Sequence, residues 1–187
     1  MGCKILTLLS KKRGGCMLRN KNIKFNKEKF KTLMHYIIYK CGHKENVGKT
    51  VLYKLLYFTD FNYYELHETM ITGESYIKWT RGPAPRDFEE SKNELISEGK
   101  IEEIENTFYN HTQIKYLSLK KPDDNVFNEQ ELNCINKTIK KLSNKNASEM
   151  TAYSHEDMPW MVAEDNEELE PEFVFYRDPE YCVGNYD

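Results

Sequence analysis

The feature that most constrains this fold is the segment 51–66, which is apolar around most of a helical circumference. A helix with one apolar face packs against a surface, whereas a helix that is apolar nearly all round has to be enclosed by other elements. We therefore expect 51–66 to be a central core helix, with the rest of the chain arranged around it. The residues that carry this pattern are Val51, Leu52, Leu55, Leu56, Phe58 and Phe61.

Four other segments have helical patterns, and each is long enough to cover part of the core helix. Asn26 is a suitable N-cap for the first of them and Gly42 a suitable stop. Asn128 and Glu131 have the spacing of a capping box. Ser148 is a suitable N-cap for the last and shortest helix. The helices are predicted over residues 26–41, 86–98, 128–142 and 148–153.

Three short segments have the alternation or β-branched content of strands. Residues 75–80 alternate, and residues 81–85, with one Gly and two Pro, read as a turn segment. Residues 101–104 and 114–119 are predicted to pair across a polar loop. We therefore expect an α+β fold, in which a single, mainly helical domain carries a small antiparallel sheet or hairpin. The helix at 86–98 followed by the hairpin at 101–119 resembles the helix and wing of a winged-helix domain, so we expect the fold to be winged-helix-like in part.

The two ends of the chain have opposite charge. Residues 1–32 carry ten Lys and Arg against one Glu, and residues 156–187 carry eleven Asp and Glu against one Arg. Such ends pair with each other, bind separate partners or are solvated tails, and the pattern alone leaves the three open. We expect a basic N-terminal extension at 1–25, a folded domain at 26–163 and an acidic, loop-like segment at 164–187.

Cysteine usage and hydropathy indicate a cytoplasmic protein. The five cysteines are scattered and form no C-x-x-C pair, which is typical of thiols in a reducing compartment. No apolar run approaches the length that spans a bilayer, so we expect no membrane association.

No motif nominates an enzyme, a cofactor or a metal. Gly48-Lys49-Thr50 lacks the earlier glycine of a phosphate loop, because position 43 is His, and it follows a helix where a strand is required. Cys41 and His43 are the one close pair of metal-ligand type, and no nucleophile signature occurs. We expect no catalytic residues, no cofactor and no metal. Residues 86–100 carry three basic and five acidic residues, which argues against a nucleic-acid partner.

The segment Ser154–Trp160, S-H-E-D-M-P-W, is the part of the chain that generic folding rules explain least. A Trp directly after a Pro combines a restricted backbone with a large apolar side chain. Trp160 is expected either to plug the bottom of the core or to anchor a partner.

Four short motifs then occur in a fixed order along the chain. They are K-L-L-Y-F-x-D from Lys54, T-G-x-x-Y from Thr72, G-P-x-P from Gly82 and S-H-x-x-x-P-W from Ser154. This ordered set resembles the Panacea, or SocA-like, antitoxin domain of bacteria, archaea and phages, over approximately residues 28–163. The resemblance implies a type II toxin–antitoxin system, with phage defence as a setting, and no catalytic residues.

The resemblance implies an antitoxin that neutralises an adjacently encoded toxin by direct protein–protein binding. The family also implies an alternative, a proteolytic adaptor that delivers a toxin to a ClpXP-type protease. The winged-helix-like plan leaves a further alternative, a DNA-binding transcriptional regulator. Homo-oligomerisation stays open. Aromatic and polar residues at the motif positions are the expected partner contacts: Tyr57, Asp60, Tyr76, Arg81, His155 and Trp160.

Overall fold

The computed structural model describes residues 23–108 and 111–184 of the chain. All but the last three residues of the predicted basic extension, and the last three residues of the acidic segment, lie outside this range. The elements are α2 (Lys27–Cys41), α3 (Lys49–His67), β1 (Tyr76–Trp79), β2 (Gly82–Pro85), α4 (Phe88–Ser97), β3 (Ile101–Phe108), β4 (His111–Ser118), η1 (Asp124–Val126), α5 (Glu129–Leu142), α6 (Ala147–His155), α7 (Met158–Val162) and η2 (Pro171–Tyr176).

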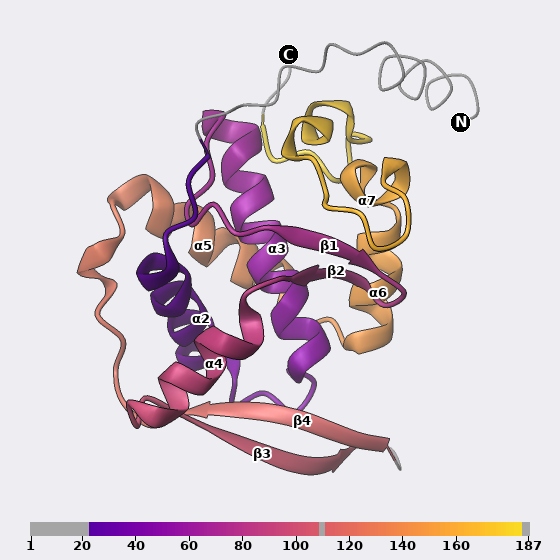
Figure 1. Ribbon diagram of the computed structural model, residues 1–187. Coiled ribbons are helices and arrows are strands. Elements are labelled where there is room, and N and C mark those ends of the chain that lie inside the picture. Colours follow the sequence, from indigo (N-terminus) through magenta and orange to yellow (C-terminus); the bar gives the residue numbers. More distant parts are fainter. Residues whose placement is uncertain (1–22, 109–110, 185–187) are drawn as a thin grey trace.

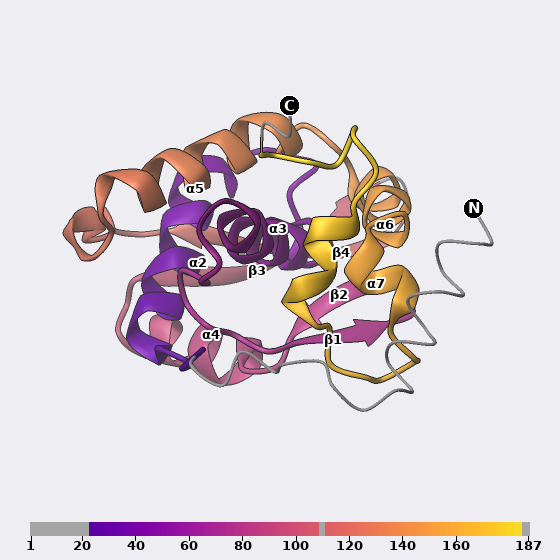
Figure 2. The same ribbon diagram turned by 90° about the horizontal axis from the view of Figure 1, so that it is seen from above.

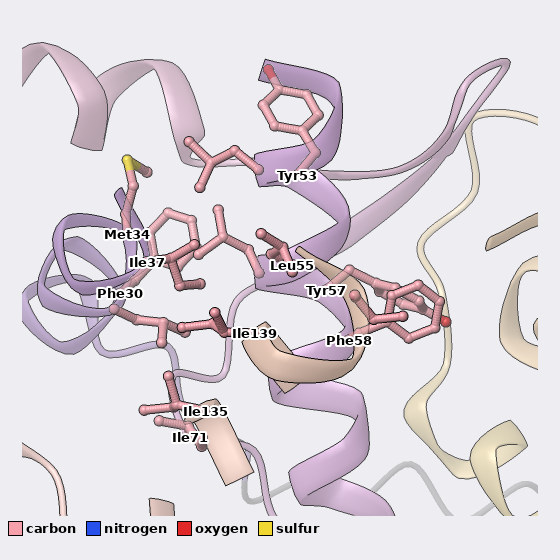
Figure 3. Close-up of a cluster of buried hydrophobic side chains, with 14 of the residues drawn as sticks. Phe30, Met34, Ile37, Tyr53, Leu55, Tyr57, Phe58, Ile71, Ile135 and Ile139 are labelled. Atoms are coloured by element: carbon pink, nitrogen blue, oxygen red, sulfur yellow. The ribbon is translucent and has the colours of Figure 1, made fainter. Parts of the chain in front are cut away.

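The helix α3 is the centre of the domain, as predicted. Every residue from Val51 to Glu65 is buried, because α2, α5, α6, β2 and η2 all pack against it. Figure 2 shows α3 nearly end-on with these elements around it. Side chains from three helices meet in the core, among them Phe30 of α2, Leu55 of α3 and Ile139 of α5 (Figure 3). The α+β class is confirmed.

Helix termini follow the predicted caps in most cases. Asn26 accepts a hydrogen bond from the Lys29 amide at the start of α2, and Asn128 forms the predicted capping box with Glu131 in α5. The prediction for α6 was wrong: its N-cap is Asn146, which forms a capping box with Glu149, so the helix begins before Ser148. A reciprocal pair satisfies two amide donors where a lone Ser satisfies one.

The C-terminal segment, residues 164–184, is packed on the domain and is not a solvated tail, which was one of the three alternatives that the charge pattern left open. Phe173 and Val174 of η2 are buried, and η2 packs against α3. Arg177 is fully enclosed and its guanidinium forms ion pairs with Asp157 at 2.7 Å and Glu65 at 2.8 Å. Charge composition suggested solvent exposure, but this one Arg neutralises carboxylates of α3 and of the loop before α7.

The prediction of a turn segment at 81–85 was also wrong, because these residues contain strand β2. It pairs antiparallel with β1, with Pro85 opposite Tyr76 and Pro83 opposite Lys78. The main-chain groups of Tyr76 and Lys78 bond to the C-terminal segment on the other side of β1. Both prolines therefore occupy non-hydrogen-bonded positions, where a missing N–H costs nothing.

The hairpin β3–β4 extends further than predicted. Its ladder runs from the pair Ile101–Ser118 to the pair Phe108–His111, through residues that we assigned to a polar loop. The hairpin projects from the helical body (Figure 1), so its outer half buries little and lacks the apolar alternation by which strands are recognised.

Replacing Arg177 with Met tests the buried ion pairs. The substitution leaves Asp157 and Glu65 as uncompensated buried charges, and we expect the free energy of unfolding at pH 7 to fall by about 3–5 kcal/mol. Arg86→Met is the matched control, since Arg86 pairs with Glu168 where both side chains are more than half exposed, and it should cost less than about 1 kcal/mol. Urea denaturation measures both, and equal losses would contradict the assigned role of Arg177.

Candidate functional site

Three of the predicted partner contacts, Tyr57, Asp60 and Tyr76, are brought together inside the domain. The Asp60 carboxylate accepts hydrogen bonds from the Thr72 amide at 2.9 Å, from the Thr72 hydroxyl and from the Tyr76 hydroxyl at 2.9 Å. The Tyr57 hydroxyl donates to Asp157 at 2.7 Å, and its ring meets that of Tyr76 edge-on. Burial raises the pKa of Asp60 to about 6. The hydrogen bond from Tyr76 fastens β1 to α3, and the bonds from Thr72 fasten the segment just before β1.

Direct contact with a partner does not fit the burial of these three side chains, which are at most 1% exposed. In this conformation the three side chains position the hairpin β1–β2. Any effect that they have on binding is therefore exerted through the position of this hairpin. The T-G-x-x-Y and K-L-L-Y-F-x-D motifs therefore encode a single buried hydrogen-bond network, of which Asp60 is the common acceptor.

The other two motifs meet at Gly82. This glycine has φ +95°, a conformation that favours Gly. A Cβ at this position would collide with the Ser154 hydroxyl and lie 2.8 Å from Cε of Lys54. The G-P-x-P, S-H-x-x-x-P-W and K-L-L-Y-F-x-D motifs are thus in contact through one residue without a side chain.

A groove lies beside the tip of the hairpin β1–β2 and has a volume of about 1420 Å³. We call it the hairpin groove. Arg81 is exposed at its rim, and Trp79, also at the rim, is 52% exposed. Its walls are the first turn of α3 with Lys54, the hairpin tip Trp79–Gly82, Thr112–Ile114 of β4 and Asn146–Glu149 at the start of α6.

His155 and Trp160 form a second feature next to the hairpin. Their rings stack with centroids 3.9 Å apart and 9° between planes, and the Lys78 ammonium lies 4.0 Å from the Trp160 ring centroid. Both rings are half-buried. Burial lowers the pKa of His155, and the charges of Lys54 and Lys78 add to this. Trp160 packs against the edge of the core and leaves part of its surface open, so its contact with a partner stays a prediction.

Two residues of the hairpin groove were missed as candidates. Lys54 begins the first motif but was not among the expected partner contacts, which were chosen from the aromatic and polar residues of the motifs. Trp79 stands on the outward-facing side of β1, opposite Gly82, and a large aromatic at an outward position of a short strand was the signal available.

Neither a metal centre nor a membrane span is found among the described residues. No group of three or more His, Cys, Asp and Glu side chains in residues 23–108 and 111–184 is placed to hold a metal ion. Within the same residues, no helix combines the length and the apolar character needed to cross a bilayer.

Gly82→Ala tests whether the motifs depend on this close approach. We expect a loss of at least about 2 kcal/mol in the free energy of unfolding, because a new Cβ adds overlap with Ser154 and Lys54 to the backbone strain. Gly99→Ala is the control: Gly99 has φ +62°, but the nearest atom to an added Cβ there is 3.7 Å away. It should cost only the strain, about 1 kcal/mol. Equal losses in thermal or urea unfolding would contradict the packing argument.

Glu74 is buried near Asp60 and near Asp87, the residue just before α4, and it makes the stability of the domain depend on pH. Burial first, and then the charge of Asp87, raise the pKa of Glu74 from 4.5 to about 8. Between these values the folded state holds a proton that the unfolded state has released, so stability falls as pH rises. Glu74→Gln removes this dependence. Between pH 5 and pH 8.5 we expect the wild type to lose roughly 4 kcal/mol more than the variant in urea denaturation, about 1.4 kcal/mol for each pH unit up to the folded-state pKa; parallel losses would refute this.

Comparison with known proteins was informative at the level of the domain family. A family model described as "Antitoxin SocA-like, Panacea domain" matches residues 52–161, which is more than half of the chain and includes all but the first three residues of α3, both hairpins and the Ser154–Trp160 motif. None of the curated proteins and none of the solved structures compared with the chain matches it. Helix α2 and the C-terminal segment lie outside the matched range and pack on it. The chain therefore belongs to the SocA-like antitoxin family that is defined by the Panacea domain.

Proposed function

We propose that this protein is an antitoxin that neutralises its cognate toxin by binding it directly at the hairpin groove. Family membership supports an antitoxin role and a toxin as the partner, and domains of this family are generally not enzymes. The observation that carries the choice of surface is the exposure of Trp79 beside Arg81, at the rim of the groove.

Trp79 is well suited to anchor a partner. A Trp side chain that is half exposed leaves a large apolar area in water, and covering that area on binding is favourable. Trp and Arg are also the residue types that most often dominate the energy of protein interfaces. The two stand close together on a short turn, so one partner surface would cover both.

The hairpin holds these side chains on a rigid base. Asp60 fastens the start of β1 to α3, and Lys78 in β1 bonds to the C-terminal segment through its main chain. At the tip, the carbonyl of Arg81 accepts a hydrogen bond from Thr151 of α6. A binding side chain on a base that is already ordered loses less conformational entropy when the partner docks. The buried motif residues therefore support binding without touching the toxin.

The same groove is a possible interface between two copies of the chain, which the prediction of homo-oligomerisation left open. A toxin is favoured here because the family supports one as partner. Sedimentation of the protein alone separates the cases, since a dimer that dissociates on Trp79→Ala would assign the groove to self-association.

Trp79→Ala tests the proposed surface. We expect it to weaken toxin binding by about 10–100-fold, the loss typical of an interface anchor, with stability nearly unchanged. The measurements are rescue of growth when the gene is co-expressed with the neighbouring toxin gene, and affinity by calorimetry. Arg81→Glu should act in the same way, since it reverses a charge at the rim.

Leu119→Ala is the matched control, because Leu119 is 55% exposed and stands past the end of β4, away from the groove. It should leave rescue and affinity intact. A harmless neighbouring gene product, or toxicity that persists beside the wild-type protein, would reject the antitoxin proposal. Full rescue by both Trp79→Ala and Arg81→Glu would reject the surface.

A further inference from the structure

The hairpin groove holds two cations without counter-charges, Lys54 in its wall and Arg81 at its rim. Lys54 is 1% exposed, and among the described residues neither its ammonium nor the guanidinium of Arg81 has a hydrogen-bond or ion-pair partner. Arg81 is near enough for its charge to act on Lys54. A buried charge is normally paired because desolvation is costly. A bound anion would supply the counter-charge that these two neighbouring cations lack.

The first turn of α3 adds backbone donors to the same place. Its N-cap is Gly48, which offers no side-chain acceptor, and no acidic residue stands in the first turn. The amides of residues 49–51 have no partner within the described part of the chain, and these residues line the groove. Free amides and the positive end of a helix dipole together bind anions, phosphate in particular.

Lys54 is directed toward these amides by helix geometry. It follows Thr50 by four residues and therefore lies on the same face of α3. Side chains of a helix lean toward its N-terminus, so the ammonium is carried toward the first turn. Packing of Cε against Gly82 holds the side chain there. The Gly48-Lys49-Thr50 segment, which lacks the glycine spacing of a phosphate loop, thus still begins a helix at a cationic groove.

We propose that the hairpin groove binds the phosphate group of a small phosphorylated molecule, held by Lys54, Arg81 and the amides of the first turn of α3. Three neighbouring charged residues set limits on the site. Lys49 is engaged by Glu89 at 2.5 Å, so it is not counted as a ligand. Glu45 and Glu149 also line the groove, and Glu149 is committed to the cap of α6. The proposal concerns the protein alone and does not depend on the toxin.

Lys54 also predicts how binding depends on pH. Burial, with the charge of Arg81 added, lowers the pKa of Lys54 from 10.5 to about 7. An anion stabilises the charged ammonium, so affinity is greatest below pH 7 and falls as pH rises toward 9. Sulfate is a useful probe of this trend because its own charge is constant over the range.

The experiment measures thermal unfolding and calorimetric binding of the full chain with inorganic phosphate, sulfate and acetate, against sodium chloride at equal ionic strength. We expect phosphate and sulfate to stabilise the wild type more than chloride, with sulfate binding weaker at pH 9 than at pH 6.5. Lys54→Met, which keeps the volume and removes the charge, should weaken binding at least about tenfold. Arg81→Gln, on the surface, provides a second variant without risk to the fold.

Lys121→Met, an exposed lysine outside the groove, should leave binding unchanged. No stabilisation beyond that of chloride, or equal binding by Lys54→Met and the wild type, would overturn the proposal. Acetate that binds as well as phosphate would also overturn it, since the site would then recognise charge alone. Adenosine monophosphate provides the last comparison: tighter binding than inorganic phosphate assigns the groove to a nucleotide, and equal binding assigns it to the free anion. If the protein does not bind these anions, the result of the toxin co-expression experiment is unaffected, so the two proposals can be tested separately.

Discussion

Enclosure of α3 is the constraint on which the rest of this structure depends. The polar side chains of α3 between Val51 and Glu65 are buried, and a buried polar group is costly unless it is hydrogen-bonded or paired. Asp60 finds donors in Thr72 and Tyr76, and Glu65 finds Arg177 together with the amides of Val183 and Gly184. The segments that follow α3 in the chain are therefore placed by the polar groups of α3 as much as by apolar packing.

This constraint explains why the family motifs are scattered in the sequence. Each contributes one part of an internal network: Asp60 the acceptor, Thr72 and Tyr76 the donors, Gly82 the space for Lys54 and Ser154. Lys54 stands apart from this scheme, since it is enclosed without a counter-charge among the described residues. A buried cation without a counter-charge lowers stability. Lys54 also lines the hairpin groove, so it belongs both to the core helix and to the surface where binding is proposed.

Much of the architecture was accessible from local patterns. The helices α2, α3, α4 and α5 follow apolar periodicity, and two of their caps follow from Asn26 and Asn128. The failures share one cause. The strand 82–85 and the outer half of β3–β4 are held by main-chain pairing with the adjacent strand, and the C-terminal segment by ion pairs with distant residues, whereas the side chains of all three carry turn or solvent-exposed character. The same division holds for the candidate site. Its motif residues were identified from the sequence, but the sequence did not show which of them are buried.

The sequence by itself determined the central helix, the α+β class and the family, because periodicity and ordered motifs are properties of the chain read in one dimension. Only the tertiary structure decided that Tyr57, Asp60 and Tyr76 are interior, and that Trp79, Arg81 and Lys54 share a groove. It also decided that Arg177 belongs to the core, although composition placed it in an acidic tail. The physical reason is that burial and charge pairing depend on distances in space, and residues 57 and 157, or 65 and 177, become neighbours only when the chain closes around α3.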